Sequence, residues 1–205
     1  MESRKPTIIV LAAGRGIRFR GAGHKLLQPV GGTTVLGSTV SNALETGLPV
    51  VVVCTETLAS EVRSMVSARD IVVLPDLGAQ GQVLPFGMGH SIAAGVSASG
   101  DAQGWLVLPG DMPLVRARSM LAVADALDDA PVAFAQYRGM RGHPVGFAAE
   151  LYSELIELHG DEGAKRLVAR YPSYGVELDD PGVLVDVDTV DDLKQLRAQQ
   201  LQAEA

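Results

Sequence analysis

Three carboxylates in two distant segments have the residue type and the spacing to hold a divalent metal ion. Asp111 follows the apolar run Trp105–Leu108 and is framed by Gly110 and by a proline on either side. Asp186 and Asp188 alternate with valines, so both point to the same side of an extended chain. Mg²⁺ takes one or two carboxylates together with phosphate oxygens and waters. The pattern predicts a Mg²⁺ site that joins Asp111 to an acid of the second segment.

Each of these acids also has a structural alternative. Asp188 could cap the last predicted helix or interact with its dipole, a role that Thr189, Asp191 and Asp192 could share. Asp111 could simply form a turn between its two prolines. The metal-site interpretation therefore depends on whether the fold brings the two segments together.

A loop rich in glycine and in cations follows the first apolar run. Within residues 13–25 there are four glycines and four basic side chains, namely Gly14, Gly16, Gly21, Gly23, Arg15, Arg18, Arg20 and Lys25. Glycines let backbone N–H groups approach a phosphate, and guanidinium groups neutralise its charge. The composition predicts a loop that binds a triphosphate; the alternative is a turn whose arginines face water.

Two better-known phosphate-binding loops do not fit this segment. Gly16 and Gly21 are spaced as in a P-loop, but Ala22 stands where the lysine is required. Gly14 and Gly16 begin a dinucleotide fingerprint, yet Phe19 occupies the third glycine position and no acid follows about 20 residues later. The spacing therefore argues against a nicotinamide-dependent oxidoreductase.

The elements that must position these residues alternate between strands and helices. Short apolar runs rich in Val and Ile alternate with segments of helical period, which is typical of βαβ units. Strands are predicted at Thr7–Ala12, Val50–Thr55, Ile71–Leu74, Trp105–Leu108, Val132–Gln136, Val145–Phe147 and Ser173–Glu177. Helices are predicted at Val35–Glu45, with Thr34 as its N-cap, and at Leu58–Val66, Met88–Ala98, Arg116–Leu127, Ala149–Leu158, Gly163–Arg170 and Val190–Gln200. This predicts a single-domain, Rossmann-like α/β fold with a mainly parallel mixed sheet flanked by helices.

Composition and charge set further limits. The chain has 205 residues, a length that favours a single domain spanning residues 1–205. Residues 1–6 and 199–205 are expected to fray. A net charge of −7 argues against nucleic acid as a partner. No apolar run approaches the roughly 20 residues that a membrane span needs, so we expect a cytoplasmic protein without a membrane partner. The one cysteine, Cys54, lies in an apolar run and is expected to be buried and inert.

The start of the helix at Met88–Ala98 could contact a nucleotide. Gly87 and Ser91 could offer N–H groups and a hydroxyl to an anion or a ribose. An ordinary glycine-capped core helix explains the same residues. The preceding connection, Pro75–Phe86, is the longest in the chain and could close over the base.

Several ordered motifs resemble one known family. Leu11-Ala12-Ala13-Gly14, followed by Arg18 and Lys25-Leu26-Leu27, is similar to the signature of the MobA-like nucleotidyltransferases, most of all the MocA-type molybdenum cofactor cytidylyltransferase branch. Gly110-Asp111-Met112-Pro113 and Asp186-Val187-Asp188-Thr189 resemble the two metal-bearing motifs of that family. The resemblance implies a fold of the nucleotide-diphospho-sugar transferase type.

Site residues follow from this resemblance, position by position. It implies nucleotide binding by Leu11, Ala12, Ala13, Gly14, Arg15, Gly16, Arg18, Lys25, Gly87, Ser91 and Gly110. It implies catalytic roles for Arg18, Lys25 and Asp111, and metal binding by Asp111 and Asp188, with Asp186 as the alternative to Asp188. In the motif Arg141-Gly142-His143-Pro144, the resemblance implies that His143 and Pro144 face the acceptor, although His143 could equally be an ordinary hydrogen-bonded histidine.

The resemblance also implies a reaction. Ala13 favours the cytidine users of the family, because guanylyl transferases tend to have glycine at this position. We therefore expect CMP transfer from CTP to the phosphate of molybdopterin, a phosphorylated pterin-type acceptor, with a molybdoenzyme or its chaperone as a possible recipient. The alternatives are a guanylyl- or other nucleotidyltransferase with another phosphorylated acceptor, or a non-catalytic cofactor-delivery protein.

Overall fold

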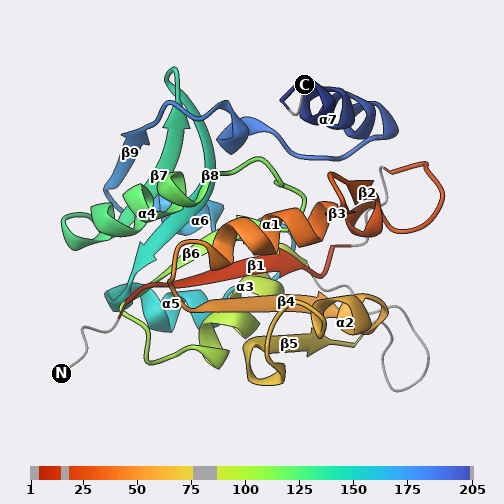
Figure 1. The fold of residues 1–205 in the computed structure, drawn as a ribbon. Coiled ribbons are helices and arrows are strands. Elements are labelled where there is room, and N and C mark those ends of the chain that lie inside the picture. Colours follow the sequence, from red (N-terminus) through yellow and green to blue (C-terminus); the bar gives the residue numbers. More distant parts are fainter. Residues whose placement is uncertain (1–4, 15–18, 76–86, 204–205) are drawn as a thin grey trace.

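A seven-stranded sheet forms the centre of the molecule in the computed structural model, which describes residues 5–14, 19–75 and 87–203. The strand order is β5-β4-β1-β6-β8-β7-β9 (Figure 1). The strands are β1 (Thr7–Ala12), β4 (Val50–Thr55), β5 (Ile71–Leu74), β6 (Gly104–Pro109), β7 (Val132–Tyr137), β8 (Met140–Ala148) and β9 (Ser173–Glu177). In this sheet β8 runs antiparallel to β6 and β7, whereas the other paired strands are parallel. The predicted α/β fold with a mainly parallel mixed sheet is confirmed.

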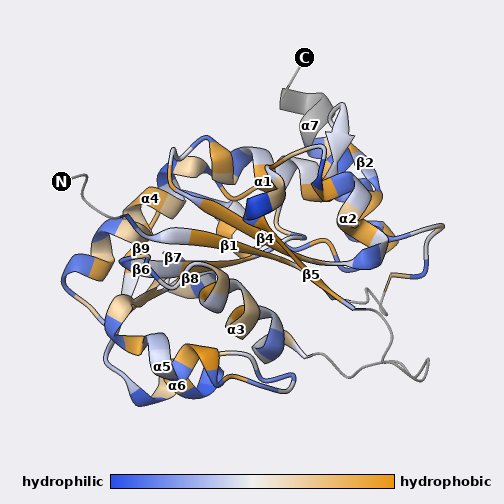
Figure 2. Ribbon diagram, turned by 90° about the horizontal axis from the view of Figure 1, so that it is seen from below, coloured by the Kyte–Doolittle hydropathy of each residue, from blue (hydrophilic) through white to orange (hydrophobic). Residues whose placement is uncertain are grey.

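Helices cover both faces of the sheet (Figure 2). They are α1 (Val35–Leu44), α2 (Glu56–Val62), α3 (Met88–Ala98), α4 (Ala117–Asp125), α5 (Tyr152–Ile156), α6 (Lys165–Arg170) and α7 (Val190–Ala203). Successive residues of β1 alternate between two cores. Ile8 belongs to the core that includes residues of α1, α2, α4 and α7, and Ile9 belongs to the core that includes residues of α3, α5 and α6. A strand buried on both faces is apolar at nearly every position, which explains the continuous run in β1.

Several predicted boundaries were wrong. β8 begins at Met140 rather than Val145, because the polar residues and the proline before Val145 interrupt the apolar run without ending the strand. Helix α2 spans Glu56–Val62 instead of Leu58–Val66. The predicted helix Ala149–Leu158 is a 3₁₀ turn (Ala149–Leu151) followed by α5.

The ends of three further helices differ from the predicted ones by a few residues, and one short strand pair was not predicted. Helix α6 begins at Lys165 rather than Gly163, since Gly163 has a φ of 58° and cannot belong to a right-handed helix. Helix α4 ends at Asp125, where a 3₁₀ turn follows, and α7 continues past Gln200 to Ala203. The short pair β2 (Pro29–Val30) and β3 (Thr33–Thr34) was not predicted.

The predicted cap of α1 is present. The Thr34 hydroxyl accepts a hydrogen bond from the Gly37 amide at 3.0 Å. Among the helices of the described ranges, none is long and apolar enough to span a membrane.

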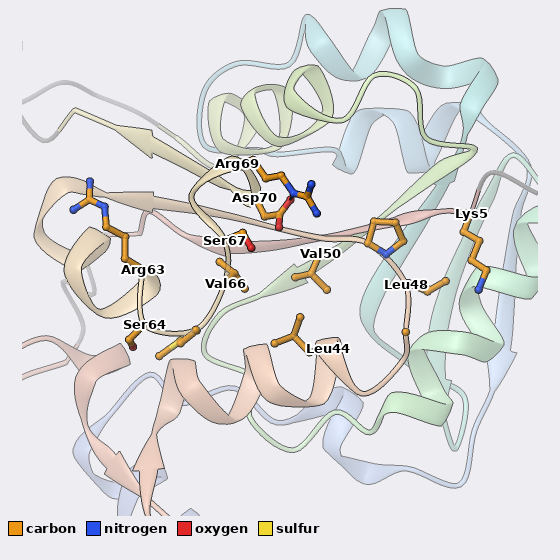
Figure 3. A pocket seen from close by; sticks show the side chains of 13 residues that line it. Lys5, Leu44, Leu48, Val50, Arg63, Ser64, Val66, Ser67, Arg69 and Asp70 are labelled. Atoms are coloured by element: carbon orange, nitrogen blue, oxygen red, sulfur yellow. Dashed lines mark ion pairs between the residues drawn. The ribbon is translucent and has the colours of Figure 1, made fainter. Parts of the chain in front are cut away.

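A hollow of about 1260 Å³ lies between the end of α1 and the segment Arg63–Asp70 (Figure 3). Lys5 and Val50 line it, and these residues lie just before β1 and at the first position of β4. The hollow is therefore at the amino ends of these parallel strands. Within the described part of the chain, none of the residues predicted to bind substrate or metal lines this hollow. Ligands of open α/β sheets bind at the carboxyl ends of the strands, so the functional site is expected at the opposite end of the sheet.

Candidate active site

The fold brings three carboxylates together at the carboxyl end of β6. Oxygen atoms of Asp111, Asp186 and Asp188 all lie within 4.8 Å of one another. Asp111 lies two residues after the end of β6, and the other two acids lie between a 3₁₀ turn (Pro181–Leu184) and α7. The prediction placed Asp111 with one acid of the second segment, and the structure places it with both.

A backbone hydrogen bond holds the two segments side by side. The Val187 amide donates to the Asp111 carbonyl oxygen at 2.9 Å, and the Val187 side chain is fully buried. Because neighbouring residues of an extended chain point to opposite sides, burying Val187 turns Asp186 and Asp188 toward Asp111. The alternation that was read from the sequence thus has a direct structural consequence.

Lys25 lies between two of the carboxylates. Its Nζ atom is 2.5 Å from Asp111 Oδ2 and 2.9 Å from Asp188 Oδ1, and the residue is only 9% exposed. Burial alone would lower the pKa of Lys25, but the charges and hydrogen bonds of Asp111 and Asp188 outweigh it and raise that pKa above its ordinary value. Lys25 is therefore a buried cation held by two acids.

Burial and the neighbouring carboxylates also shift the pKa of Asp186, the third acid of the cluster. Burial, followed by the charge and hydrogen bond of Asp188 and the charge of Asp111, raises the pKa of Asp186. Three neighbouring carboxylates repel one another, so an additional cation is favoured at this position. Carboxylate oxygens are hard ligands suited to Mg²⁺ or Mn²⁺, and the donor set fits such an ion.

The alternative role for Asp188, as helix cap, is taken by other residues. The Asp192 carboxylate accepts from the amides of Asp188 and Thr189 at 3.1 and 2.7 Å, and the Thr189 hydroxyl accepts from the Asp192 amide at 3.2 Å. This reciprocal arrangement is a capping box at the start of α7. The Asp188 carboxylate therefore does not cap α7, and it contacts Lys25 instead.

A residue that sequence reasoning missed attaches the acidic segment to the protein. The buried Asp180 carboxylate accepts from the Arg116 amide at 3.1 Å, the Ser119 hydroxyl at 2.6 Å and the Gly182 amide at 3.1 Å. These bonds join the segment before Asp186 to the start of α4. A lone aspartate among turn residues gave no signal for this role, because its partners lie about 60 residues away in sequence.

We expect Asp180→Ala to destabilise the protein. The substitution leaves the Arg116 amide and the Ser119 hydroxyl without their acceptor in a buried place, which costs about 3 kcal/mol. For a chain of this size, that loss lowers Tm by roughly 6–12 °C. Differential scanning calorimetry measures the shift, and Asp179→Ala, which removes an exposed neighbouring side chain, is the control. A Tm within 2 °C of the wild-type value in Asp180→Ala would contradict the role of this network.

The end of β1 lies beside the acidic cluster. The Gly110 amide donates to the Leu11 carbonyl oxygen at 2.8 Å, and a Cβ atom at Gly110 would lie 2.9 Å from that oxygen. Gly110 is thus needed for close packing of the two strand ends. Ala12 and Ala13 are buried, and Gly14 is exposed with open space around it. The remaining predicted loop residues, Arg15, Gly16 and Arg18, lie outside the described residues.

At the start of α3 the glycines serve packing. A Cβ atom at Gly87 would collide with the Gly160 backbone, and the Gly89 amide donates to the Gly160 carbonyl oxygen at 2.9 Å. Ser91 is buried, and its backbone amide donates a helical hydrogen bond to the Gly87 carbonyl oxygen. Packing at the start of a glycine-capped core helix therefore explains Gly87, and the nucleotide contacts of Gly87 and Ser91 stay predictions. Most of the predicted closing loop, residues 76–86, lies outside the described residues.

The predicted acceptor residues lie within β8. The peptide bond between His143 and Pro144 is cis. Burial lowers the pKa of His143, whereas the negative charge of nearby Asp111 acts in the opposite direction. A Cβ atom at Gly142 would collide with the Val183 carbonyl oxygen, so β8 packs directly on the turn that precedes the acidic segment. His143 therefore lies within electrostatic reach of the carboxylates.

The family follows from comparison with known proteins. The model of the MobA-like NTP transferase domain matches residues 8–175. The chain belongs to this family. A match over that range includes Lys25 and Asp111, which the fold brings together, and it supports the family resemblance read from the motifs.

Individual proteins of known sequence and structure are also similar to this chain. The bifunctional protein GlmU of Burkholderia multivorans (strain ATCC 17616 / 249) is 35% identical over 122 residues, covering 60% of this chain and 26% of GlmU. The matched region therefore spans about a quarter of the length of such curated relatives.

Solved structures match over nearly the whole chain. Rv0371c from Mycobacterium tuberculosis H37Rv is 30% identical with a TM-score of 0.79, covering 97% of this chain and 100% of that chain. A complex of Rv0371c with manganese is also 30% identical with a TM-score of 0.73, covering 95% and 98%. A nucleotidyl transferase from Methanothermobacter thermautotroptrophicus (Mth528) is 27% identical with a TM-score of 0.79, covering 98% and 100%.

Proposed function

We propose that the protein is a Mg²⁺-dependent cytidylyltransferase that transfers CMP from CTP to the phosphate of a molybdopterin-type acceptor and releases pyrophosphate. The observation that carries this proposal is the meeting of Lys25 with Asp111, Asp186 and Asp188 at the strand ends beside the glycine loop. A cation and a group of hard oxygen ligands at one place suit a triphosphate and its metal ion.

The reaction needs positioning and charge neutralisation more than it needs a base. The acceptor phosphate oxygen is already anionic near neutral pH, so it can attack the α-phosphorus of the nucleotide in line while pyrophosphate leaves. A divalent ion held by the three carboxylates would neutralise charge on the phosphates. Lys25, together with Arg18, stabilises the departing pyrophosphate, and exposed Gly14 allows the phosphates to approach the backbone.

Two further features support the choice of metal and substrates. The manganese complex of Rv0371c, a protein 30% identical to this one, supports a divalent metal ion as the cofactor. The alanine at position 13 supports CTP over GTP through the motif resemblance. His143 and Pro144 lie in β8, where the charge of Asp111 acts on His143, and they are our candidates for contacts with the acceptor.

The first test of this function is thermal stability in the presence of Mg²⁺ with CTP, GTP, ATP or UTP. A ligand at 100 times its dissociation constant adds roughly 2.7 kcal/mol, which corresponds to a Tm increase of about 5–10 °C for a chain of this size. We expect this increase with CTP and a much smaller one with the other nucleotides. A larger increase with GTP or ATP would contradict the assignment of CTP as the nucleotide, but it would still agree with a nucleotidyl transfer.

The second test is turnover. With Mg²⁺, CTP and molybdopterin, we expect pyrophosphate release together with formation of the cytidine dinucleotide, detected by mass spectrometry. Omitting either CTP or molybdopterin should stop the release. Binding of CTP without turnover on molybdopterin would contradict the acceptor assignment.

A further inference from the structure

The ammonium group of Lys25 occupies the place where a metal ion would contact Asp111 and Asp188. Its Nζ atom is 2.5 and 2.9 Å from oxygens of these two acids, and the third acid of the cluster, Asp186, is within the same 4.8 Å group. Only a tenth of the Lys25 side chain is exposed. In the protein without ligands, Asp111 and Asp188 are therefore already paired with a cation from the chain itself.

Lys25 and a divalent ion compete for the same two carboxylates, those of Asp111 and Asp188. Mg²⁺ requires its ligands at about 2.0–2.1 Å, so an ion on Asp111 and Asp188 would lie within a few ångströms of an ammonium in its present place. Two cations at that separation repel strongly in a partly buried site. We propose that Lys25 is an exchangeable cation. Its ammonium occupies the metal site of the free protein, and it moves from the carboxylates to the nucleotide phosphates when metal and nucleotide bind together.

The local structure permits such an exchange without movement of the backbone. Lys25 begins a short 3₁₀ turn whose main chain is held by the bonds from Leu27 to His24 and from Gln28 to Lys25. Leu26 is buried and anchors the turn in the core. The four-carbon stem of lysine is flexible, so the ammonium can change partners while its Cα atom stays in place.

The exchange makes binding of metal and nucleotide cooperative. A metal ion that enters alone must displace the ammonium into a place without an anionic partner, which weakens its binding. When a triphosphate is present, the displaced ammonium gains the phosphates as partners, so each ligand strengthens the binding of the other. This consequence rests on the proposed function, whereas the competition between Lys25 and the metal ion does not need a nucleotide.

The competition can be measured with Mn²⁺ alone. Electron paramagnetic resonance reports the concentration of free Mn²⁺ during titration of the wild-type protein, Lys25→Met and Lys5→Met. We expect Lys25→Met to bind Mn²⁺ at least 10-fold more tightly than the wild type, because Asp111 and Asp188 then lack their ammonium partner. Lys5 is exposed and precedes β1 at the opposite edge of the sheet, so Lys5→Met removes the same net charge and should bind Mn²⁺ as the wild type does.

The two sets of outcomes are distinguishable. Equal or weaker Mn²⁺ binding by Lys25→Met than by the wild type overturns the exchange, even if CTP stabilises the protein and turnover is observed. Tighter binding by Lys25→Met supports the exchange, even if CTP has no effect and the proposed function fails.

A measurement on the wild-type protein covers the case in which Lys25→Met does not fold. Acetylation by acetic anhydride, followed by peptide mass spectrometry, reports how accessible each lysine amine is. We expect saturating Mn²⁺ without nucleotide to accelerate acetylation of Lys25 several-fold and to leave Lys5 unchanged. An unchanged rate at Lys25, with Mn²⁺ bound to the protein, overturns the exchange.

Discussion

Asp111→Asn is expected to abolish nucleotidyl transfer while the protein stays folded. Asp111 is the acid at the end of β6 and contributes an oxygen to the three-carboxylate group. Asparagine has the same size, but it lacks the negative charge that attracts a divalent ion. We expect a loss of more than about 10³-fold, beyond the range found for removal of a single electrostatic donor.

The fold should tolerate this change because the backbone contacts of position 111 do not depend on the carboxylate. The Val187 amide donates to the carbonyl oxygen of residue 111, and that bond remains. Turnover of CTP with molybdopterin, together with far-UV circular dichroism, measures both effects. Asp101→Asn makes the same substitution at an exposed residue before β6, and it should keep wild-type turnover. Near-wild-type turnover in Asp111→Asn would exclude the proposed metal site.

Lys25→Ala is expected to lower the rate by at least about 10²-fold, the order expected for the loss of one electrostatic stabiliser of a transition state. In the proposed reaction, the ammonium stabilises the departing pyrophosphate, so the loss should appear in kcat at saturating CTP. Single-turnover measurement of CMP transfer separates this chemical step from product release.

The role of Lys25 in the reaction can be separated from its role among the carboxylates. Removing the ammonium leaves Asp111 and Asp188 without their cation, and added Mg²⁺ can replace it there. High Mg²⁺ should therefore restore the Tm of Lys25→Ala without restoring its rate. Lys5→Ala is the matched control and should be fully active. Recovery of the rate at high Mg²⁺ would show that Lys25 serves only to neutralise the acids.

Local patterns were sufficient for most of the framework. The bounds of β1, β4, β5 and α3 are those predicted from apolar runs, glycines and helical period. These elements form where neighbouring residues agree on one conformation, so short windows of sequence predict them. Where tertiary contacts override the local pattern, as in β8 with its internal proline, the predicted bounds were too short.

By itself, the sequence determined the acids that could bind a metal, because their placement after a buried strand and the alternation of Asp186 with Asp188 are local features. Only the tertiary structure decided that all three acids meet, and that Lys25 lies among them. Lys25 is 86 residues from Asp111 and 163 from Asp188, and no local pattern encodes such distances. The meeting depends on β6 pairing with β1 and on the packing of the segment held by Asp180, which are properties of the assembled core.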